Sequence, residues 1–175
     1  MTPANTSSHD HGSLQGRHAL ITGASSGIGA ATARALWRAG ATVALTARRA
    51  ERLSALQGEL NAVRAGSASV ATCDVREMAD LFRVFEAEKS AGRTVDLVVA
   101  NAGLGLGVSP VQSGDPEDWS TMIDTNVKGV LHTIRAALPA MRELGRGDLV
   151  LLGSVAGREI YPGGNVYNAT KHAVK

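Results

Sequence analysis

Two side chains near the end of the sequence have the spacing of an acid–base pair. Tyr167 and Lys171 lie in the stretch GGNVYNATKHAVK, residues 163–175. Residues four positions apart share a face of a helix, so a phenol and an ammonium would lie one turn apart. An ammonium about 4 Å away stabilises a phenolate by about 4 kcal/mol at an effective dielectric of about 20, so the phenol could exchange a proton near neutral pH. In the alternative interpretation, Tyr167 is a half-buried helix residue and Lys171 is solvated.

A glycine-rich stretch near the start, TGASSGIG at residues 22–29, is a second candidate site. It lies between an apolar run and a segment with apolar residues at helical spacing. Glycines at such a junction let the backbone approach a pyrophosphate, and the helix N-terminus offers it free N–H groups. The stretch therefore predicts a dinucleotide site, although a plain strand–helix turn is the alternative. The residues expected to bind are Gly23, Ser25, Gly27, Ile28 and Gly29.

The end of the next apolar run indicates which dinucleotide is bound. An acid there would accept the ribose hydroxyls of NAD, but residues 40–50 contain none and carry Arg48 and Arg49 instead. Guanidinium groups complement a 2′-phosphate, so NADP is favoured over NAD. In the alternative interpretation, both arginines are solvated residues at a helix start.

The elements that must position these residues alternate along the chain. Continuous apolar runs predict strands at 18–22, 42–47, 68–73, 95–100 and 148–153. Such runs are typical of a parallel sheet that is covered on both faces. With helices between the strands, they predict an α/β fold with a doubly wound parallel sheet of the Rossmann type.

The helices follow from apolar spacing and capping residues. Helical spacing is found at 28–39, 50–62 and 76–90, and Asp115-Pro116 opens a long helix to about Met141, kinked near Pro139. We expect the second helix to bury Leu53, Leu56 and Leu60. We expect the third to bury Met78, Leu81, Phe82 and Phe85.

The carboxyl ends of the strands should hold the ligand. In open α/β sheets ligands bind beyond these ends, and polar or glycine residues follow every predicted strand. Beyond the glycine loop and the arginines, these are Asp74-Val75, Asn101-Ala102-Gly103 and Ser154. We expect all of them at one edge of the sheet.

With these motifs the sequence resembles the short-chain dehydrogenase/reductase family over residues 16–175. TGASSGIG matches TGxxxGxG, and ANAG at 100–103 matches NNAG, with Ala100 as a departure. Tyr167 and Lys171 match YxxxK, at the usual separation from Ser154. Asn126, within DTNVKG, matches the family's helix asparagine.

The resemblance implies an NADP-dependent oxidoreductase that moves hydride between the nicotinamide and a carbonyl or alcohol. Tyr167 would be the general acid–base, and Lys171 would also hold the nicotinamide ribose. Ser154 would hydrogen-bond the substrate, and Asn126 would support a water chain to the lysine. Asn126 could instead be structural, or have both roles.

The resemblance also implies an adenine contact for Asp74, and a homodimer or homotetramer built partly on the long helix. A non-catalytic dinucleotide sensor or scaffold on the same fold is the alternative function. Asp124, His132 and His172 match no motif, so we expect them to be scaffold or surface. Tyr161 has no lysine four residues beyond it.

Family members continue beyond this length with a sixth and a seventh strand. We therefore expect the chain to be C-terminally incomplete, and inactive or nearly so by itself. Strand 148–153 would be a bare apolar edge, and the short helix that carries Tyr167 would have few partners. The loops 104–114 and 155–163 are mostly uncharged, which suggests a neutral small-molecule carbonyl or alcohol.

Composition argues against several other classes of protein. The formal net charge is +2, from 18 basic and 16 acidic residues, and aromatic residues make up 3%, so we expect no nucleic-acid partner. No apolar run approaches the roughly 20 residues of a membrane helix. Cys73 is the only cysteine, so we expect no intramolecular disulfide, no metal site and a small buried apolar role for its side chain.

The polar N-terminus has no hydrophobic stretch of the kind used for export. We expect residues 1–14 to be a disordered tail and residues 15–175 to form one dinucleotide-binding domain. The expected compartment is the cytoplasm.

Overall fold

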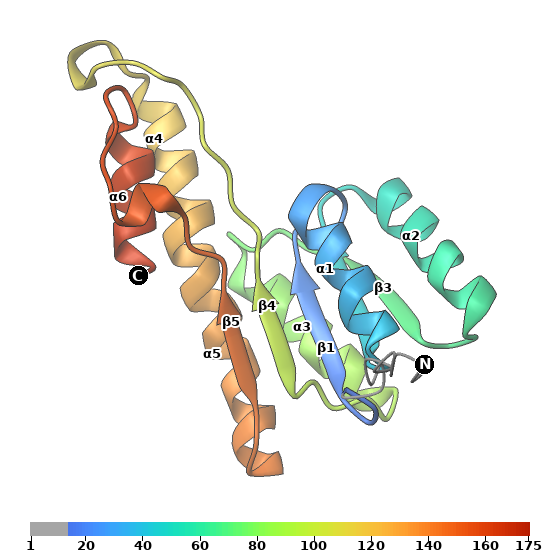
Figure 1. The fold of residues 1–175 in the computed structure, drawn as a ribbon. Helices are drawn as coiled ribbons and strands as arrows, with labels where there is room; N and C mark the ends of the chain where they lie inside the picture. The colour runs from blue at the N-terminus through green and yellow to red at the C-terminus, as the bar shows by residue number, and fades with distance from the viewer. Residues whose placement is uncertain (1–13) are drawn as a thin grey trace, which may run out of the picture.

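The computed structural model describes residues 14–175, and within them a parallel five-stranded sheet forms the centre of the fold (Figure 1). The strand order is β3-β2-β1-β4-β5, with β1 and β4 adjacent in the middle. This order reverses direction beside β1, which confirms the predicted doubly wound sheet. The strands are β1 (His18–Thr22), β2 (Thr42–Ala47), β3 (Ala68–Thr72), β4 (Leu97–Ala100) and β5 (Asp148–Leu151).

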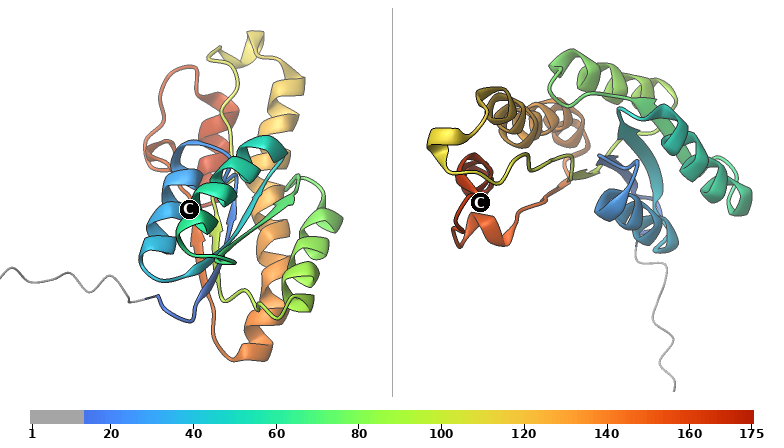
Figure 2. Two further views of the ribbon diagram at one scale, coloured as in Figure 1. Left: turned by 90° about the vertical axis from the view of Figure 1, so that its right-hand side faces the viewer. Right: turned by 90° about the horizontal axis from the view of Figure 1, so that it is seen from above.

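Helices cover the sheet on both faces (Figure 2). α1 and α2 pack on one face, and α3 and α5 pack on the other. The helices are α1 (Gly27–Arg38), α2 (Ala50–Val63), α3 (Met78–Ser90), α4 (Pro116–Ile123), α5 (Gly129–Leu144) and α6 (Asn165–Ala173). Short 3₁₀ turns η1 (Val111–Ser113) and η3 (Val155–Gly157) lie in the loops before α4 and α6.

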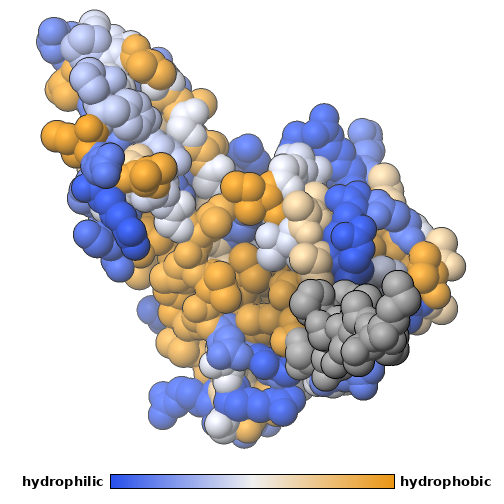
Figure 3. All heavy atoms as spheres, in the orientation of Figure 1, coloured by the Kyte–Doolittle hydropathy of each residue, from blue (hydrophilic) through white to orange (hydrophobic). Residues whose placement is uncertain are grey.

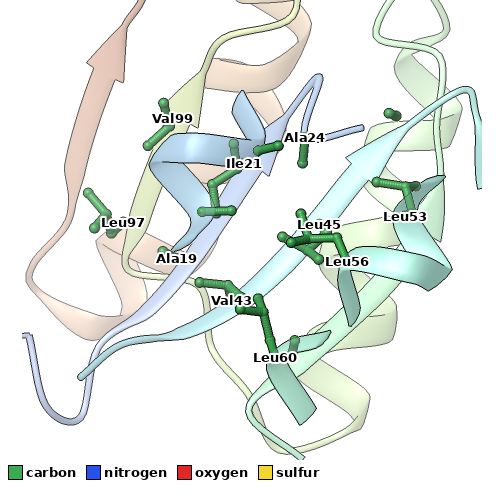
Figure 4. Close-up of a cluster of buried hydrophobic side chains, with 14 residues drawn as sticks. Ala19, Ile21, Ala24, Val43, Leu45, Leu53, Leu56, Leu60, Leu97 and Val99 are labelled. Atoms are coloured by element: carbon green, nitrogen blue, oxygen red, sulfur yellow. The ribbon is translucent and has the colours of Figure 1, made fainter. Parts of the chain in front are cut away.

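Each face of the sheet has its own apolar core. The predicted stripe of α2, Leu53, Leu56 and Leu60, packs against β1 and β2 (Figure 4). On the other face, α3 and α5 pack on β1 and β4. The predicted buried face of α3 was partly wrong, because Phe82 is 43% exposed and Met78 is only partly buried, whereas Val84 is buried. Positions 81, 84, 85 and 88 share one helical face, and Phe82 lies outside it.

The predicted helix from Pro116 to Met141 changes its hydrogen bonding in the middle, rather than near Pro139. A π-helical turn, η2 (Asp124–Lys128), separates α4 from α5, and α5 continues through Pro139 to Leu144. π-Turns inside helices often occur at functional sites, because the extra residue redirects side chains. Asn126 lies in this turn and is buried.

β5 is an apolar edge strand, as predicted. Its only neighbour in the described part of the sheet is β4, and Leu149, Val150 and Leu151 are 37–48% exposed. Apolar surface gathers over this side of the molecule, between α6 and α1 (Figure 3).

The prediction that the Tyr167 helix has few partners was wrong. α6 packs against α4, η2 and η3, and it buries Asn168, Thr170 and Lys171.

At the other end of the domain, Leu14 packs on the core, and its N–H donates to the Ala39 carbonyl at 2.9 Å. The folded part therefore includes Leu14, and the rest of the expected tail lies outside the described residues.

A buried polar cluster lies at the amino-terminal edge of the sheet. Glu88 accepts hydrogen bonds from His18 at 3.1 Å, from Ser69 at 2.7 Å and from Arg93 at 2.6 Å. Burial by itself raises the pKa of Glu88, but the hydrogen bonds from His18, Arg93 and Ser69 lower it to about 2. The carboxylate is thus stabilised far from the edge where the candidate site lies.

Candidate functional site

A cleft of about 780 Å³ lies at the carboxyl ends of the strands. These strand ends are at the top of the sheet in Figure 1. Ser154 lines it, whereas Asn126 does not. All the predicted cofactor-binding residues line it: Gly23, Ser25, Gly27, Ile28, Gly29, Arg48, Arg49, Asp74, Val75, Asn101, Ala102, Gly103, Tyr167 and Lys171. The sheet therefore brings residues from across the sequence to a single opening.

The glycine loop is tightly packed against the end of β4. Gly23 and Gly27 have φ angles of 68° and 55°, a region that favours glycine. A Cβ on Gly29 would lie 2.5 Å from the Asn101 side-chain nitrogen, so only glycine fits there. The Asn101 amide donates to the Thr22 carbonyl at 2.9 Å, and this bond fixes the start of the loop.

Thr22 is a site residue that the sequence analysis did not single out. It is the last residue of β1, and its hydroxyl oxygen accepts from the Asn101 N–H at 3.1 Å and from the Ala102 N–H at 3.0 Å. These bonds join β1 to the backbone beyond β4 at the crevice between the two strands. Its place at the head of TGASSGIG was the available signal.

The two predicted arginines differ in their contacts. Arg49 donates to the Ser25 hydroxyl at 2.8 Å and to the Ser26 hydroxyl at 2.6 Å, which folds its side chain over the glycine loop. Arg48 is exposed beside the same cleft. Two guanidinium groups at the end of β2 give this part of the cleft a positive charge suited to a phosphate.

The end of β3 carries a carboxylate with a lowered pKa. Hydrogen bonds from the Arg76 guanidinium, the shortest at 2.6 Å, lower the pKa of Asp74. Val75 is buried, and its carbonyl accepts from His132 Nδ1 at 3.0 Å. Cys73 is buried at the cleft as the predicted apolar residue, and burial raises its pKa to about 12.

At the other end of the cleft lie Ser154, Tyr167 and Lys171. The Lys171 ammonium lies 5.9 Å from the centre of the Tyr167 ring, and it donates to the Leu152 carbonyl at 3.0 Å. Burial lowers the pKa of Lys171. The Ser154 hydroxyl accepts from the Ala156 N–H at 3.1 Å, which holds the start of η3.

Asn126 is close to this group but is buried beneath the cleft. Its carboxamide accepts from the Leu104 N–H at 2.9 Å and donates to the Leu104 carbonyl at 2.8 Å. The same nitrogen donates to the Thr170 hydroxyl at 3.1 Å. These are the contacts of the structural role that the sequence left open, and the water-chain role remains a prediction.

The residues expected to be scaffold or surface lie outside the cleft. Asp124 pairs with Lys128 at 2.8 Å on the helix surface, and His172 Nδ1 donates to the Asn168 carbonyl at 2.8 Å. Tyr161 is exposed. Residues 14–175 contain no group of three or more His, Cys, Asp or Glu placed to hold a metal ion. In the same range, no helix has the length and apolar character needed to cross a membrane.

Comparison with known proteins gives relatives of one family. The NADP-dependent 3-hydroxy acid dehydrogenase of Salmonella typhi is 44% identical over 156 residues, which cover 89% of this chain and 61% of the relative. Sulfoacetaldehyde reductase 2 of Chromohalobacter salexigens is 45% identical over 157 residues, which cover 89% of this chain and 62% of the relative. The chain thus spans about three fifths of the length of these relatives.

A solved structure with the same fold is that of a gluconate 5-dehydrogenase from Burkholderia cenocepacia J2315, in complex with NADP and tartrate. Its TM-score is 0.88 at 32% sequence identity, over 94% of this chain and 64% of that chain. The family model described as short chain dehydrogenase matches residues 17–175. Because this match covers nearly all of the sequence, the chain belongs to the short-chain dehydrogenase family.

Proposed function

We propose that the protein is an NADP-dependent oxidoreductase that interconverts a small alcohol and its carbonyl compound. The observation that carries this proposal is the shared cleft. A glycine loop and two arginines line one end, and Ser154, Tyr167 and Lys171 line the other. A dinucleotide sensor would need the first set of residues only.

The residues at the glycine-loop end fit a dinucleotide phosphate. A Cβ on Gly23 or Gly29 would meet the Asn101 side chain, so glycine at both positions lets the loop pack closely on the end of β4. The N-terminus of α1 adds a partial positive charge beside it. Arg48 and Arg49 would hold a 2′-phosphate, with Ser25 and Ser26 orienting the second guanidinium.

Tyr167 is the proposed general acid–base. When bound, NADP supplies the hydride acceptor or donor, and Tyr167 transfers the proton of the substrate oxygen. The Lys171 ammonium lies 5.9 Å from the centre of the Tyr167 ring, which places a buried cation beside the proposed acid–base. Ser154 hydrogen-bonds the substrate oxygen and orients it.

The substrate is proposed to be a short hydroxy acid or an aldehyde with an acidic group. One relative is named for 3-hydroxy acids and the other for sulfoacetaldehyde, and both names describe compounds with an anionic group. This differs from the neutral compound suggested by the loop sequences. A panel of short 3-hydroxy acids, hydroxysulfonates and neutral alcohols of equal length separates the two, since the proposal requires higher kcat/KM for the acidic members.

The decisive test of the enzyme proposal is Tyr167→Phe in the whole protein, because the chain itself spans about three fifths of the length of its relatives. Loss of the phenol should reduce kcat with NADP by at least a hundredfold, because general acid–base catalysis contributes about 10²–10⁴. The Kd for NADPH, measured by fluorescence, should stay within about threefold. Tyr161→Phe is the matched control, since Tyr161 is exposed and should leave both quantities unchanged. Undiminished turnover in Tyr167→Phe would exclude the proposed mechanism.

The cofactor preference is tested by Arg48→Ala and Arg49→Ala. A charge-assisted hydrogen bond to phosphate is worth about 1.5–3 kcal/mol, so each change should raise the Kd for NADPH roughly 10- to 100-fold. The Kd for NADH should hardly change. Arg52→Ala removes an exposed arginine that does not line the cleft and serves as the control. Equal losses for NADPH and NADH would contradict the assignment of these arginines to the 2′-phosphate.

We also propose a homodimer or homotetramer that uses the outer face of α5. Leu131 and Leu138 are 60% and 41% exposed there and line an apolar groove with Ile134 and Pro139. Exposed apolar patches of this kind often mark protein–protein contacts. The cytoplasmic location predicted from the sequence is likewise a proposal.

A further inference from the structure

The short segment Gly103–Leu104–Gly105 lies between β4 and the catalytic candidates. Neither glycine has a positive φ angle, so backbone conformation does not require glycine at either position. Space is the remaining structural reason. A Cβ on Gly103 would lie 3.2 Å from Asn126 Oδ1 and 3.6 Å from Lys171 Nζ.

Gly105 lies against the ring of Tyr167. A Cβ on Gly105 would be 3.3, 3.5 and 3.6 Å from three ring carbons of Tyr167, Cδ2, Cε2 and Cγ. The first of these distances is tighter than an ordinary van der Waals contact of about 3.5–4.0 Å between carbons. The absence of a side chain on Gly105 therefore leaves just enough space for the Tyr167 ring, and the Gly105 backbone limits how far the ring can move on this side.

Leu104, between the two glycines, is held by a side chain instead of a neighbouring strand. The Asn126 carboxamide accepts from its N–H at 2.9 Å and donates to its carbonyl at 2.8 Å. Asn126 comes from the buried π-helical turn and also donates to Thr170 on α6, at 3.1 Å. The Thr170 hydroxyl in turn donates to the Tyr167 carbonyl at 2.8 Å. Asn126 thus hydrogen-bonds both the segment that contains Gly105 and the helix that carries Tyr167.

We propose that Gly105 is a positioning residue for catalysis, and that the Asn126–Thr170 bond fixes the distance between Gly105 and the Tyr167 ring. This inference rests on the proposed role of Tyr167. Its physical basis is that proton transfer needs the phenol within a narrow range of the substrate oxygen, and a displacement of 1 Å can cost about a hundredfold in rate. Gly105 keeps the Tyr167 ring at the position in the cleft where its phenol can act together with Lys171 and Ser154.

The first test is Gly105→Ala in the whole protein, assayed with 3-hydroxypropanoate and NADP. A Cβ at 3.3 Å requires the ring to shift by only a few tenths of an ångström, so the variant should fold. We expect kcat to fall about tenfold, while KM and the Kd for NADPH stay within about twofold. Gly58→Ala is the control, since a Cβ at this exposed α2 position meets nothing within 4 Å.

A second pair of variants keeps the test decisive if Gly105→Ala does not fold. Thr170→Val keeps the shape of the side chain but removes the hydroxyl that Asn126 and the Tyr167 carbonyl engage. We expect kcat to fall severalfold, and Thr170→Ser to restore it. The inference is overturned if Gly105→Ala keeps the wild-type kcat, if its loss of kcat is matched by a loss of NADPH affinity, or if Thr170→Val turns over like Thr170→Ser. A Tyr167→Phe variant that still turns over would instead remove the proposed function itself.

Discussion

Thr22 offers the sharpest test of how the cleft is held together. Its hydroxyl accepts from the N–H groups of Asn101 and Ala102, at 3.1 and 3.0 Å. The Asn101 N–H also has the Val99 carbonyl as an acceptor, at 3.0 Å. For the Ala102 N–H, Thr22 is the acceptor seen among the described residues. Thr22→Val therefore leaves one half-buried donor without a partner, while the side chain keeps its shape.

The expected cost is about 1–2 kcal/mol in the free energy of unfolding, in the lower part of the range for an unsatisfied buried donor because Ala102 is only partly buried. For a domain of this size, that corresponds to a fall of about 2–8 °C in Tm. The Kd for NADPH should also rise by at least about threefold, because Thr22 and Asn101 together hold the glycine loop against β4.

Thr46→Val is the matched control. Thr46 lies on β2, is 1% exposed like Thr22, and donates one hydrogen bond to the Ile21 carbonyl at 3.2 Å. Its loss leaves no N–H without an acceptor, so we expect less than about 1 kcal/mol and no change in NADPH affinity. Thermal unfolding and fluorescence titration measure both quantities. If Thr22→Val is no more destabilising than Thr46→Val, the hydroxyl does not hold the crevice and the reasoning is refuted.

Three further predictions concern charge and backbone. The pKa of Glu88 is about 2 in the folded protein, against 4.5 in an unfolded chain, so its ionisation contributes about 3 kcal/mol to the free energy of unfolding above pH 4.5, and this contribution is lost as the pH falls towards 2. Urea titrations between pH 2 and 5 should show a steeper loss of stability for the wild type than for Glu88→Gln, and the same pH dependence in both proteins would contradict the prediction. Lys171→Met should abolish turnover yet raise or preserve Tm, because it removes a buried ammonium whose pKa is lowered by burial. A large fall in Tm would contradict the inference that this buried charge destabilises the folded protein. Gly58→Ala, on the exposed side of α2, should stabilise the protein by about 0.5–1 kcal/mol in thermal unfolding, and a lower Tm would show an unrecognised contact.

Much of the fold followed from local pattern. β1 and β2 have the predicted bounds, and the other strands and first three helices agree within a few residues, because continuous apolar runs and helical spacing are strong signals here. Phe82 was misplaced because a helix with several apolar residues can be turned towards the sheet in more than one way. Only the packing of α3 on β1 and β4 selects the face at positions 81, 84, 85 and 88.

In the candidate site, too, some features could be predicted from the sequence and others depend on packing. Residues after the strands could be placed at one edge from topology alone, since parallel strands carry their carboxyl ends to the same side. The hydrogen bonds of Thr22 and Thr170 and the close approach of Gly105 to the Tyr167 ring could not be foreseen, because each depends on a contact between segments far apart in the sequence.

The sequence by itself determined the fold class, the family and many of the residues around the cleft. These depend on the order of residue types along the chain, which apolar periodicity and motif spacing report directly. The tertiary structure decided how those residues are held. Asn126, in a π-helical turn, hydrogen-bonds Leu104, and Arg49 hydrogen-bonds the hydroxyls of two serines. α6 packs against α4, η2 and η3. Such contacts arise from the packing of distant segments, where a shift of one ångström makes or breaks a hydrogen bond, and local sequence does not encode distances of that kind.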